Sequence, residues 1–280
     1  MIKLGIFGDQ TTNPELLEQL KTMPGTEVAG VYFSGNATVP DGFAELLSPI
    51  SLMDISDAIL ILSDKTISCE LIRLILRKSK HMYLKTIPNL NVKEIKELID
   101  LEKEAGVVTF IYNPFSYIPH FDPFSNKFEK PLLINLRTCF EGSMIKPSHE
   151  MLLLITAINR VVQSNYKKLD IFGMRESEAQ IIVNLRVEFE NGSVVNLTIT
   201  QEKISGCCEI FEQTKRTKFE FQTPLYILYP HLNQEYTAIG NYIRLIQSQD
   251  KKANSFDNLL NGVQIVHEIR EHLRFNEIDF

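Results

Sequence analysis

Cysteine is scarce in this sequence of 280 residues, with four copies in all. Cys207 and Cys208 are adjacent, whereas Cys69 and Cys139 each stand alone. This arrangement supplies neither the spaced pairs of a disulfide framework nor the paired ligands of a zinc site. We therefore predict no metal site, and we expect the protein in the cytoplasm, where thiols stay reduced.

Long apolar segments and a surplus of positive charge are also missing. No uncharged stretch approaches the roughly 20 residues that a membrane helix needs. The first residues of the chain lack the apolar region and the cleavage site of a signal peptide. The 29 basic and 35 acidic residues give a formal net charge of -6. No basic stripe is present to neutralise phosphates, so we expect neither a membrane nor a nucleic acid as a partner.

The chain is long enough for two domains, and its first 112 residues alternate between short apolar runs and amphipathic stretches. This spacing is typical of β-α units and predicts a parallel sheet covered by helices. Asn91 with Glu94 indicates a capping box before a helix that Gly106 ends. We interpret residues 1–115 as a Rossmann-like domain of the dinucleotide-binding type. Its predicted strands are residues 3–8, 28–33, 58–62, 81–85 and 107–112.

Four prolines then interrupt the chain, which a domain boundary explains most simply. Beyond them, residues 181–189 and 194–200 alternate apolar and polar side chains around Asn191-Gly192, a strong hairpin signal. Helices are predicted at residues 149–162, 235–247 and 255–273. We interpret residues 116–280 as an α+β domain with an open, mainly antiparallel sheet and C-terminal helices, so the chain belongs to the α/β class.

Three short motifs suggest a family. They are the opening strand into Gly8, the run SKHMYLKTIP at residues 79–88, and the helix entry NSFD at residues 254–257. With the order of the predicted elements, they resemble the glucose-fructose oxidoreductase and inositol dehydrogenase family over nearly the whole chain. The resemblance implies NAD or NADP as cofactor, a sugar or polyol as ligand, and association of copies through the second sheet. It also implies a lysine at the nicotinamide and an aspartate and a histidine that complete proton transfer.

The turn after the first strand is where the family binds phosphate. A Gly-x-Gly-x-x-Gly fingerprint needs glycine for the turn, for close approach of the pyrophosphate and for helix packing. Those places fall on Gly8, Gln10 and Asn13. Asp9 adds a negative charge where phosphate would lie. We therefore favour an ordinary β-α turn over a working dinucleotide site, and we expect NAD and NADP to bind weakly.

Two further features bear on the cofactor. The second strand ends in Tyr-Phe-Ser at residues 32–34, where the family has an acidic residue for the adenosine ribose. In the other direction, helix-start amides and the hydroxyls of Thr11 and Thr12 suit a smaller anion. The candidate cofactor-binding residues are Gly8, Asp9, Gln10, Thr11, Thr12 and Ser63.

Two residues are candidates for proton chemistry, Lys85 and His149. Aligned without a gap from His81, the family's lysine falls on Thr86, and a deletion of one residue would bring Lys85 to its place. His149 matches the family's histidine, but Ile145 stands where its aspartate partner is expected, and an unpartnered imidazole is a poor proton relay. The alternatives are a solvated strand-end cation for Lys85 and a locally bonded helix-start residue for His149.

Two functions remain open from the sequence. The first is a divergent NAD(P)-dependent oxidoreductase acting on a sugar or polyol. The second is a non-catalytic descendant of the fold that binds a small ligand or another protein chain. The activity of the family favours the first function, whereas the missing motif residues favour the second.

Overall fold

The computed structural model describes residues 1–35, 39–65, 67–117, 128–139, 147–177, 180–200, 205–221, 231–249 and 255–275. The chain forms two compact units. Unit 1 comprises Met1–Asn113 and His231–Asp257, and unit 2 comprises Pro114–Pro230 and Asn258–Phe280.

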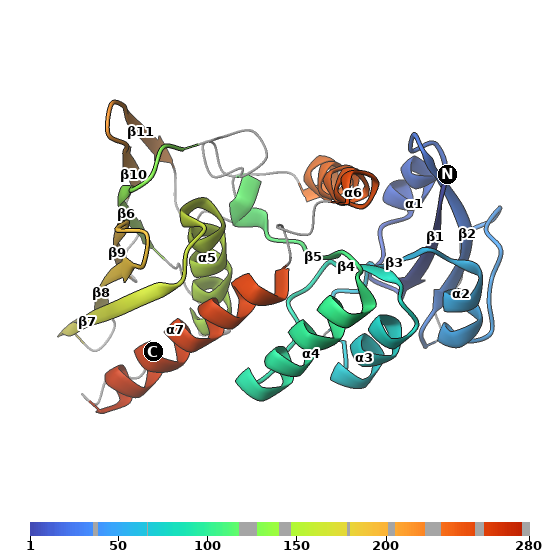
Figure 1. The fold of residues 1–280 in the computed structure, drawn as a ribbon, viewed down its shortest axis with the longest axis horizontal. Coiled ribbons are helices and arrows are strands. Elements are labelled where there is room, and N and C mark those ends of the chain that lie inside the picture. The colour runs from blue at the N-terminus through green and yellow to red at the C-terminus, as the bar shows by residue number, and fades with distance from the viewer. Residues whose placement is uncertain are drawn as a thin grey trace. The chain divides into compact units, whose positions relative to one another are not determined.

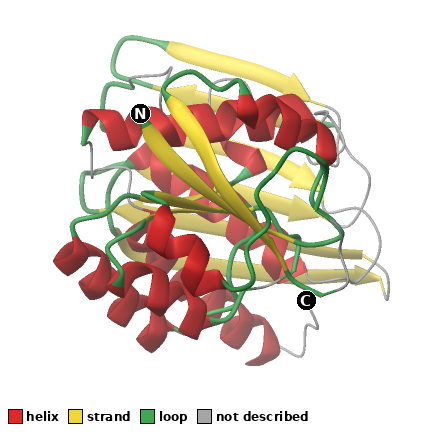
Figure 2. Ribbon diagram, turned by 90° about the vertical axis from the view of Figure 1, so that its right-hand side faces the viewer, coloured by secondary structure: helices red, strands yellow, loops and turns green. Residues whose placement is uncertain are grey.

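Unit 1 contains a five-stranded parallel sheet in the order β2-β1-β3-β4-β5 (Figure 1). The predicted Rossmann-like sheet is therefore confirmed. Figure 2, which faces this unit, shows the first strand beginning at the N-terminal label, with helices around the strands. The strands are β1 (Ile2–Gly8), β2 (Thr26–Phe33), β3 (Ala58–Ile61), β4 (His81–Leu84) and β5 (Thr109–Ile111). The helices are α1 (Pro14–Lys21), α2 (Pro49–Ile55), α3 (Cys69–Arg77), α4 (Val92–Ala105) and α6 (His231–Ser248).

The helix boundaries of unit 1 follow from local side-chain chemistry. The Asn91 side chain accepts a hydrogen bond from the backbone N–H of Glu94, and the Glu94 carboxylate accepts one from the N–H of Asn91. This reciprocal pair starts α4, as the sequence predicted. Gly106 ends the helix with a φ of 68°, a left-handed conformation that glycine adopts without steric cost.

The two faces of the parallel sheet are covered in different ways. Right-handed crossovers place α1, which leads outward to β2, on the face opposite α2, α3 and α4. One crossover helix does not cover a five-stranded sheet, and α6 packs beside α1 and against β4 on that same face (Figure 1). The ring of Tyr242 on α6 lies 5.8 Å from that of Tyr83 and 6.2 Å from that of Phe110, centroid to centroid. These contacts fix α6 on the sheet.

This placement corrects the division made from the sequence, which assigned every residue after 115 to the second domain. The helix α6 lies late in the chain but belongs to unit 1. Its inward residues Ala238, Ile239 and Tyr242 are fully buried. Periodicity shows that a helix has an apolar face, but it does not show which sheet that face will cover.

Unit 2 contains a six-stranded sheet in the order β11-β10-β6-β9-β8-β7. The pair β6–β9 is parallel and the other pairs are antiparallel, so the predicted open, mainly antiparallel sheet is confirmed. The predicted hairpin joins β8 to β9, with Gly192 at a φ of 82°. The strands are β6 (Leu133–Cys139), β7 (Tyr166–Ser177), β8 (Gln180–Phe189), β9 (Val194–Thr200), β10 (Gly206–Phe211) and β11 (Arg216–Phe221). The helices are η1 (Pro114–Tyr117), α5 (Pro147–Val162) and α7 (Ser255–Phe275).

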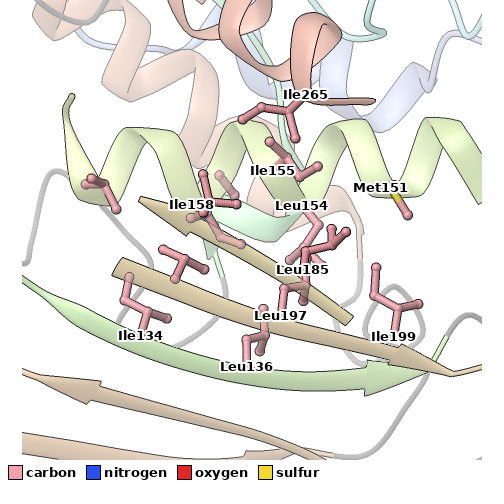
Figure 3. Packing of buried hydrophobic residues seen from close by; sticks show 14 of the residues in the cluster. Ile134, Leu136, Met151, Leu154, Ile155, Ile158, Leu185, Leu197, Ile199 and Ile265 are labelled. Carbon is pink, nitrogen blue, oxygen red and sulfur yellow. The ribbon is translucent and has the colours of Figure 1, made fainter. Parts of the chain in front are cut away.

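One face of this sheet packs on α5 and α7 to form the core of unit 2. Leu185 on β8 and Leu197 on β9 lie against Leu154 and Ile158 on α5, and Ile265 on α7 belongs to the same buried cluster on the side of α5 away from these strands (Figure 3). All five side chains are at most 3% exposed. Because strand side chains alternate, the intervening residues Asn184, Arg186 and their neighbours point away from this core.

The edge strand β7 was not predicted. Leu169 and Ile171 pack against the core, but Phe172 and Met174 on the other face are 62% and 42% exposed. Apolar residues on both faces blur the alternation that identifies a half-buried strand. The open face is therefore less uniformly polar than the sequence indicated.

Candidate functional site

The candidate residues of unit 1 gather at one edge of its parallel sheet. The neighbouring strands β1, β3 and β4 all direct their carboxyl ends to this edge. Gly8 ends β1 and residues 9–13 follow it, residues 63–65 follow β3, and Lys85 follows β4. Ligands of α/β proteins bind at the carboxyl ends of parallel strands. We call these three segments, together with Glu235 of α6, the strand-end site.

Asp9 is buried in the turn after β1, with 1% of its surface exposed. Its Oδ1 accepts hydrogen bonds from the backbone N–H of Thr11 at 2.8 Å and from the Thr11 hydroxyl at 2.5 Å. Its Oδ2 accepts one from the Ser63 hydroxyl at 2.7 Å and lies 3.7 Å from the ammonium nitrogen of Lys65. The Asp9 carboxylate thus joins the turn after β1 to the loop after β3.

The backbone of this turn is also paired within the chain. The N–H of Asp9 donates to Oγ1 of Thr12 at 3.0 Å, and the N–H of Thr12 donates to the carbonyl oxygen of Asp9 at 3.0 Å. The hydroxyl oxygen of Thr11 accepts a bond from the N–H of Asp64 at 3.1 Å. The N–H groups of residues 9, 11 and 12 therefore already have acceptors.

Burial and hydrogen bonding act in opposite directions on the Asp9 carboxyl. Burial by itself raises the pKa of Asp9, but the hydrogen bonds from Thr11 and Ser63 and the charge of Lys65 outweigh burial. The pKa of Asp9 consequently lies below its ordinary value. Asp9 is ionised at neutral pH and places a fixed negative charge in the turn.

Gly8 ends β1, and the ring of Phe33 packs directly against it. A Cβ at position 8 would lie 2.5 Å from Cε1 of Phe33 and 2.7 Å from Oγ1 of Thr12. The N–H of Ser34 donates to the carbonyl oxygen of Gly8 at 2.9 Å, which holds the end of β2 beside the turn. The family's acidic ribose ligand is expected at this end of β2. An aromatic ring fills the space at the glycine instead.

These side chains do not fit a dinucleotide bound in the manner of the fingerprint. At the second glycine position Gln10 is exposed, and at the third the side chain of Asn13 caps α1 by accepting a bond from the Glu15 N–H. The donors of the turn hold Asp9, which is itself an anion. The turn therefore does not offer the close amide approach on which pyrophosphate binding depends.

Lys85 lies in an ion-pair cluster at the end of β4. Its ammonium nitrogen is 2.9 Å from Oδ1 of Asp64 and 3.7 Å from Oε2 of Glu235. Its side chain is 18% exposed, so Lys85 is not a freely solvated cation. Thr86, which takes the family's lysine position without a gap, donates its hydroxyl hydrogen bond to the carbonyl oxygen of Ser63 at 3.0 Å. Of these two neighbours, Lys85 brings a charge to the strand-end site.

Glu235 on α6 faces Lys85 with a side chain that is 7% exposed. Burial raises the pKa of Glu235 to about 7, and the charge of Asp64 adds to the rise although Lys85 opposes it. Within the described ranges, Oε1 of Glu235 has no hydrogen-bond partner. This carboxyl group can take up or release a proton near neutral pH, and one of its oxygens can accept a bond from a ligand.

The candidates named from the sequence fall into separate groups. Asp9, Thr11, Thr12 and Ser63 form one hydrogen-bonded network, and Gly8 lies beside it. Gln10 is exposed, and Lys85 belongs to the second cluster. His149 lies in α5 of unit 2, but its side chain is outside the described residues.

Sequence reasoning missed Asp64, Lys65 and Glu235. The first two could have been found, because they directly follow a predicted strand and strand ends carry sites. Glu235 gave no such signal, since it is one acidic residue in an amphipathic helix.

Metal binding and membrane insertion find no support in the parts of the chain that the structure describes. No cluster of three or more potential ligands there could hold a metal ion. None of the described helices combines the length and apolarity needed to cross a membrane. All four cysteines are free thiols.

Together, a Rossmann-type unit with its candidate site at the strand ends and a unit with an open, mainly antiparallel sheet define the fold of the sugar and polyol dehydrogenases. Solved structures agree. The chain is similar to a probable dehydrogenase from Thermotoga maritima, with a TM-score of 0.72, 14% identity, and coverage of 98% of this chain and 97% of the other. For UDP-N-acetylglucosamine 3-dehydrogenase from Acidithiobacillus ferrooxidans the TM-score is 0.69 at 12% identity, covering 96% and 97%.

A scyllo-inositol dehydrogenase from Lactobacillus casei gives a TM-score of 0.68 at 12% identity, covering 99% and 97% of the two chains. The resemblance to the glucose-fructose oxidoreductase and inositol dehydrogenase family is thereby confirmed in the fold. No protein-family model matches the sequence, and no curated protein sequence matches it.

Proposed function

We propose that this chain is a descendant of the oxidoreductase fold that binds NAD and NADP weakly or not at all and acts as a small-ligand-binding module. The observation that carries the proposal is the ring of Phe33 against Gly8, where a Cβ would lie 2.5 Å from the ring. In the family's mode of binding, the cofactor's ribose and pyrophosphate approach this end of the turn. Because an aromatic ring is packed there, we infer that the cofactor no longer approaches this end of the turn.

Titration of the wild-type chain with NAD(H) and NADP(H) is expected to give dissociation constants in the millimolar range or beyond. Each missing or repelling contact costs on the order of 1 to 3 kcal/mol. Two or three such losses turn a micromolar site, worth about 8 kcal/mol, into a millimolar one. Calorimetry checks this prediction. The double variant Gln10→Gly with Phe33→Asp is titrated beside the wild type and should bind the cofactor more tightly. A wild-type dissociation constant of about 10 micromolar or tighter would overturn the proposal.

The ligand that we propose is sugar-like. Lys85 can donate hydrogen bonds while Asp64 and Glu235 can accept them, and hydroxyl groups do both. Two of the similar structures are named for polyhydroxylated compounds, UDP-N-acetylglucosamine and scyllo-inositol. We propose no nucleic acid and no membrane as partner, and the cytoplasm remains the predicted location.

The second candidate is an NAD(P)-dependent oxidoreductase acting on a sugar or polyol. The observation in its favour is Lys85 next to Glu235, whose pKa is about 7, since groups that titrate near the working pH transfer protons best. His149 remains a further candidate for this role. Tight binding of NAD(P) in the titration above would establish this candidate in place of the first.

We also propose that copies of the chain associate through the open sheet of unit 2. Phe172 and Met174 are exposed on the same face of the edge strand β7. They pair with Asn184 and Ile182 of β8, so the apolar side chains sit at the margin of a polar face. A second copy would cover both apolar side chains and leave a largely hydrogen-bonded interface around them.

Light scattering is expected to give a mass above the 32.1 kDa of one chain. Replacing Phe172 and Met174 together by glutamate should restore the single-chain mass, because like charges would face each other across the interface. The matched control replaces two exposed apolar residues of unit 1, Leu47 and Ile50, in the same way. A wild-type mass of 32.1 kDa at every concentration would exclude the association.

A further inference from the structure

The negatively charged group held in the turn after β1 is a side chain of the protein, the carboxylate of Asp9. In dinucleotide-binding folds, amides at a helix start and nearby hydroxyls hold the pyrophosphate. Here a backbone amide of the turn and two hydroxyls hold a carboxylate: the N–H and hydroxyl of Thr11 and the hydroxyl of Ser63 all donate to Asp9. The ammonium group of Lys65 lies 3.7 Å away. Every one of these contacts is of a type that a bound phosphate would make.

We propose that the carboxylate of Asp9 permanently occupies the anion position of the strand-end site and so replaces the pyrophosphate as the group that joins the loops after β1 and β3. Both carboxylate oxygens are engaged, and the side chain is 1% exposed. This inference rests on the proposed function, because it names the group that stands where a cofactor would bind.

The negative charge of Asp9 opposes the binding of a second anion in the same turn. The hydrogen bonds outweigh burial, and the pKa of Asp9 lies below its ordinary value, so the carboxylate remains ionised. An incoming phosphate would need the same donors and would face this negative charge. Like charges in contact without solvent repel strongly. The turn is therefore closed to anions in general, and unit 1 has its strand-end loops joined without any cofactor.

Inorganic pyrophosphate is the probe that tests this. The wild-type chain should show no saturable binding up to about 10 mM, and Asp9→Asn should bind at least about tenfold more tightly. Asparagine keeps the size of the side chain and an oxygen that accepts from Thr11, so the turn retains its shape. The matched control is Asp100→Asn on α4, an exposed residue whose replacement changes the net charge equally. It should leave pyrophosphate binding unchanged.

A second measurement needs no variant. Carbon-detected NMR of the wild-type chain should show the Asp9 carboxyl titrating below its ordinary pKa, with no change when pyrophosphate is added. If pyrophosphate perturbs this carboxyl in the wild type, or if Asp9→Asn gains no more than Asp100→Asn, the inference is wrong. If Asp9→Asn gains no more than Asp100→Asn while the wild type still fails to bind NAD(P), the inference is wrong but the proposed function is retained. Tight binding of NAD(P) by the wild type would contradict the proposed function, whatever the Asp9 variant shows.

Discussion

The free energy of unfolding is expected to fall by about 3 kcal/mol between pH 5 and pH 8 because of the single carboxyl group of Glu102. Glu102 lies on α4 and is 1% exposed. Burial raises the pKa of Glu102 from 4.5 to about 7, the charge of Asp257 adds to it, and Thr109 lowers it only in part. Among the described residues, neither carboxylate oxygen has a partner in hydrogen-bond geometry.

The sign of this pH effect depends on whether the folded or the unfolded chain holds the proton of Glu102 more tightly. Well below pH 4.5 the Glu102 carboxyl is protonated in both the folded and the unfolded chain, so it costs nothing. As the pH rises toward 7, the unfolded chain ionises first, and stability is lost. Above the folded pKa both states are ionised and the loss stops. One pKa unit is worth about 1.4 kcal/mol, which sets the size of the effect.

Urea unfolding followed by circular dichroism at pH 5 and pH 8 checks this. In Glu102→Gln the fall in stability between the two pH values should be smaller than in the wild type by about 3 kcal/mol. Glu104→Gln is the matched control, because Glu104 is an exposed residue on the same helix. Equal pH dependence in the wild type and Glu102→Gln would show that this carboxyl is solvated or paired in the folded chain.

Replacing Lys85 by methionine is expected to destabilise unit 1 by about 1 kcal/mol at pH 8, because a carboxyl with a pKa of about 7 takes up a proton once its partner is lost, which limits the cost. Methionine keeps most of the apolar stem but removes the charge that opposes the burial of Glu235. The pKa of Glu235 should then rise further above 7. At pH 5 the Glu235 carboxyl is protonated with or without Lys85, so the destabilisation should shrink.

Two comparisons separate this effect from lost packing. The double variant Lys85→Met with Glu235→Gln should recover most of the stability at pH 8, because no uncompensated charge remains. Lys78→Met breaks a shorter pair, 2.6 Å from Asp54, yet should cost about 0.3 kcal/mol or less because the Asp54 side chain stays 55% exposed. A Lys85→Met variant that loses equal stability at pH 5 and pH 8 would contradict the coupling to Glu235.

The local pattern of the sequence was sufficient to predict most of the fold. The capping pair at Asn91 and Glu94 and the hairpin at Asn191-Gly192 formed where expected, because their partners are a few residues apart. The strand β7 was not predicted because Phe172 and Met174, on its exposed face, interrupt the alternation of apolar and polar residues. For the candidate site, the sequence identified Asp9 and Gln10 as departures from the dinucleotide fingerprint, since a motif specifies which residues must be small or neutral.

The tertiary structure decided which of these residues meet. The bond from Ser63 to Asp9 and the pairing of Lys85 with Glu235 join segments that are distant in the chain. Their partners depend on strand order and on α6 returning to the first sheet, which in turn depends on how much apolar surface the crossover helices leave uncovered. Sequence periodicity determines that an element has a face to bury. Only the assembled sheet determines what that face meets, and with it whether a buried carboxylate is held by donors, as Asp9 is, or is left to titrate near pH 7, as Glu235 is.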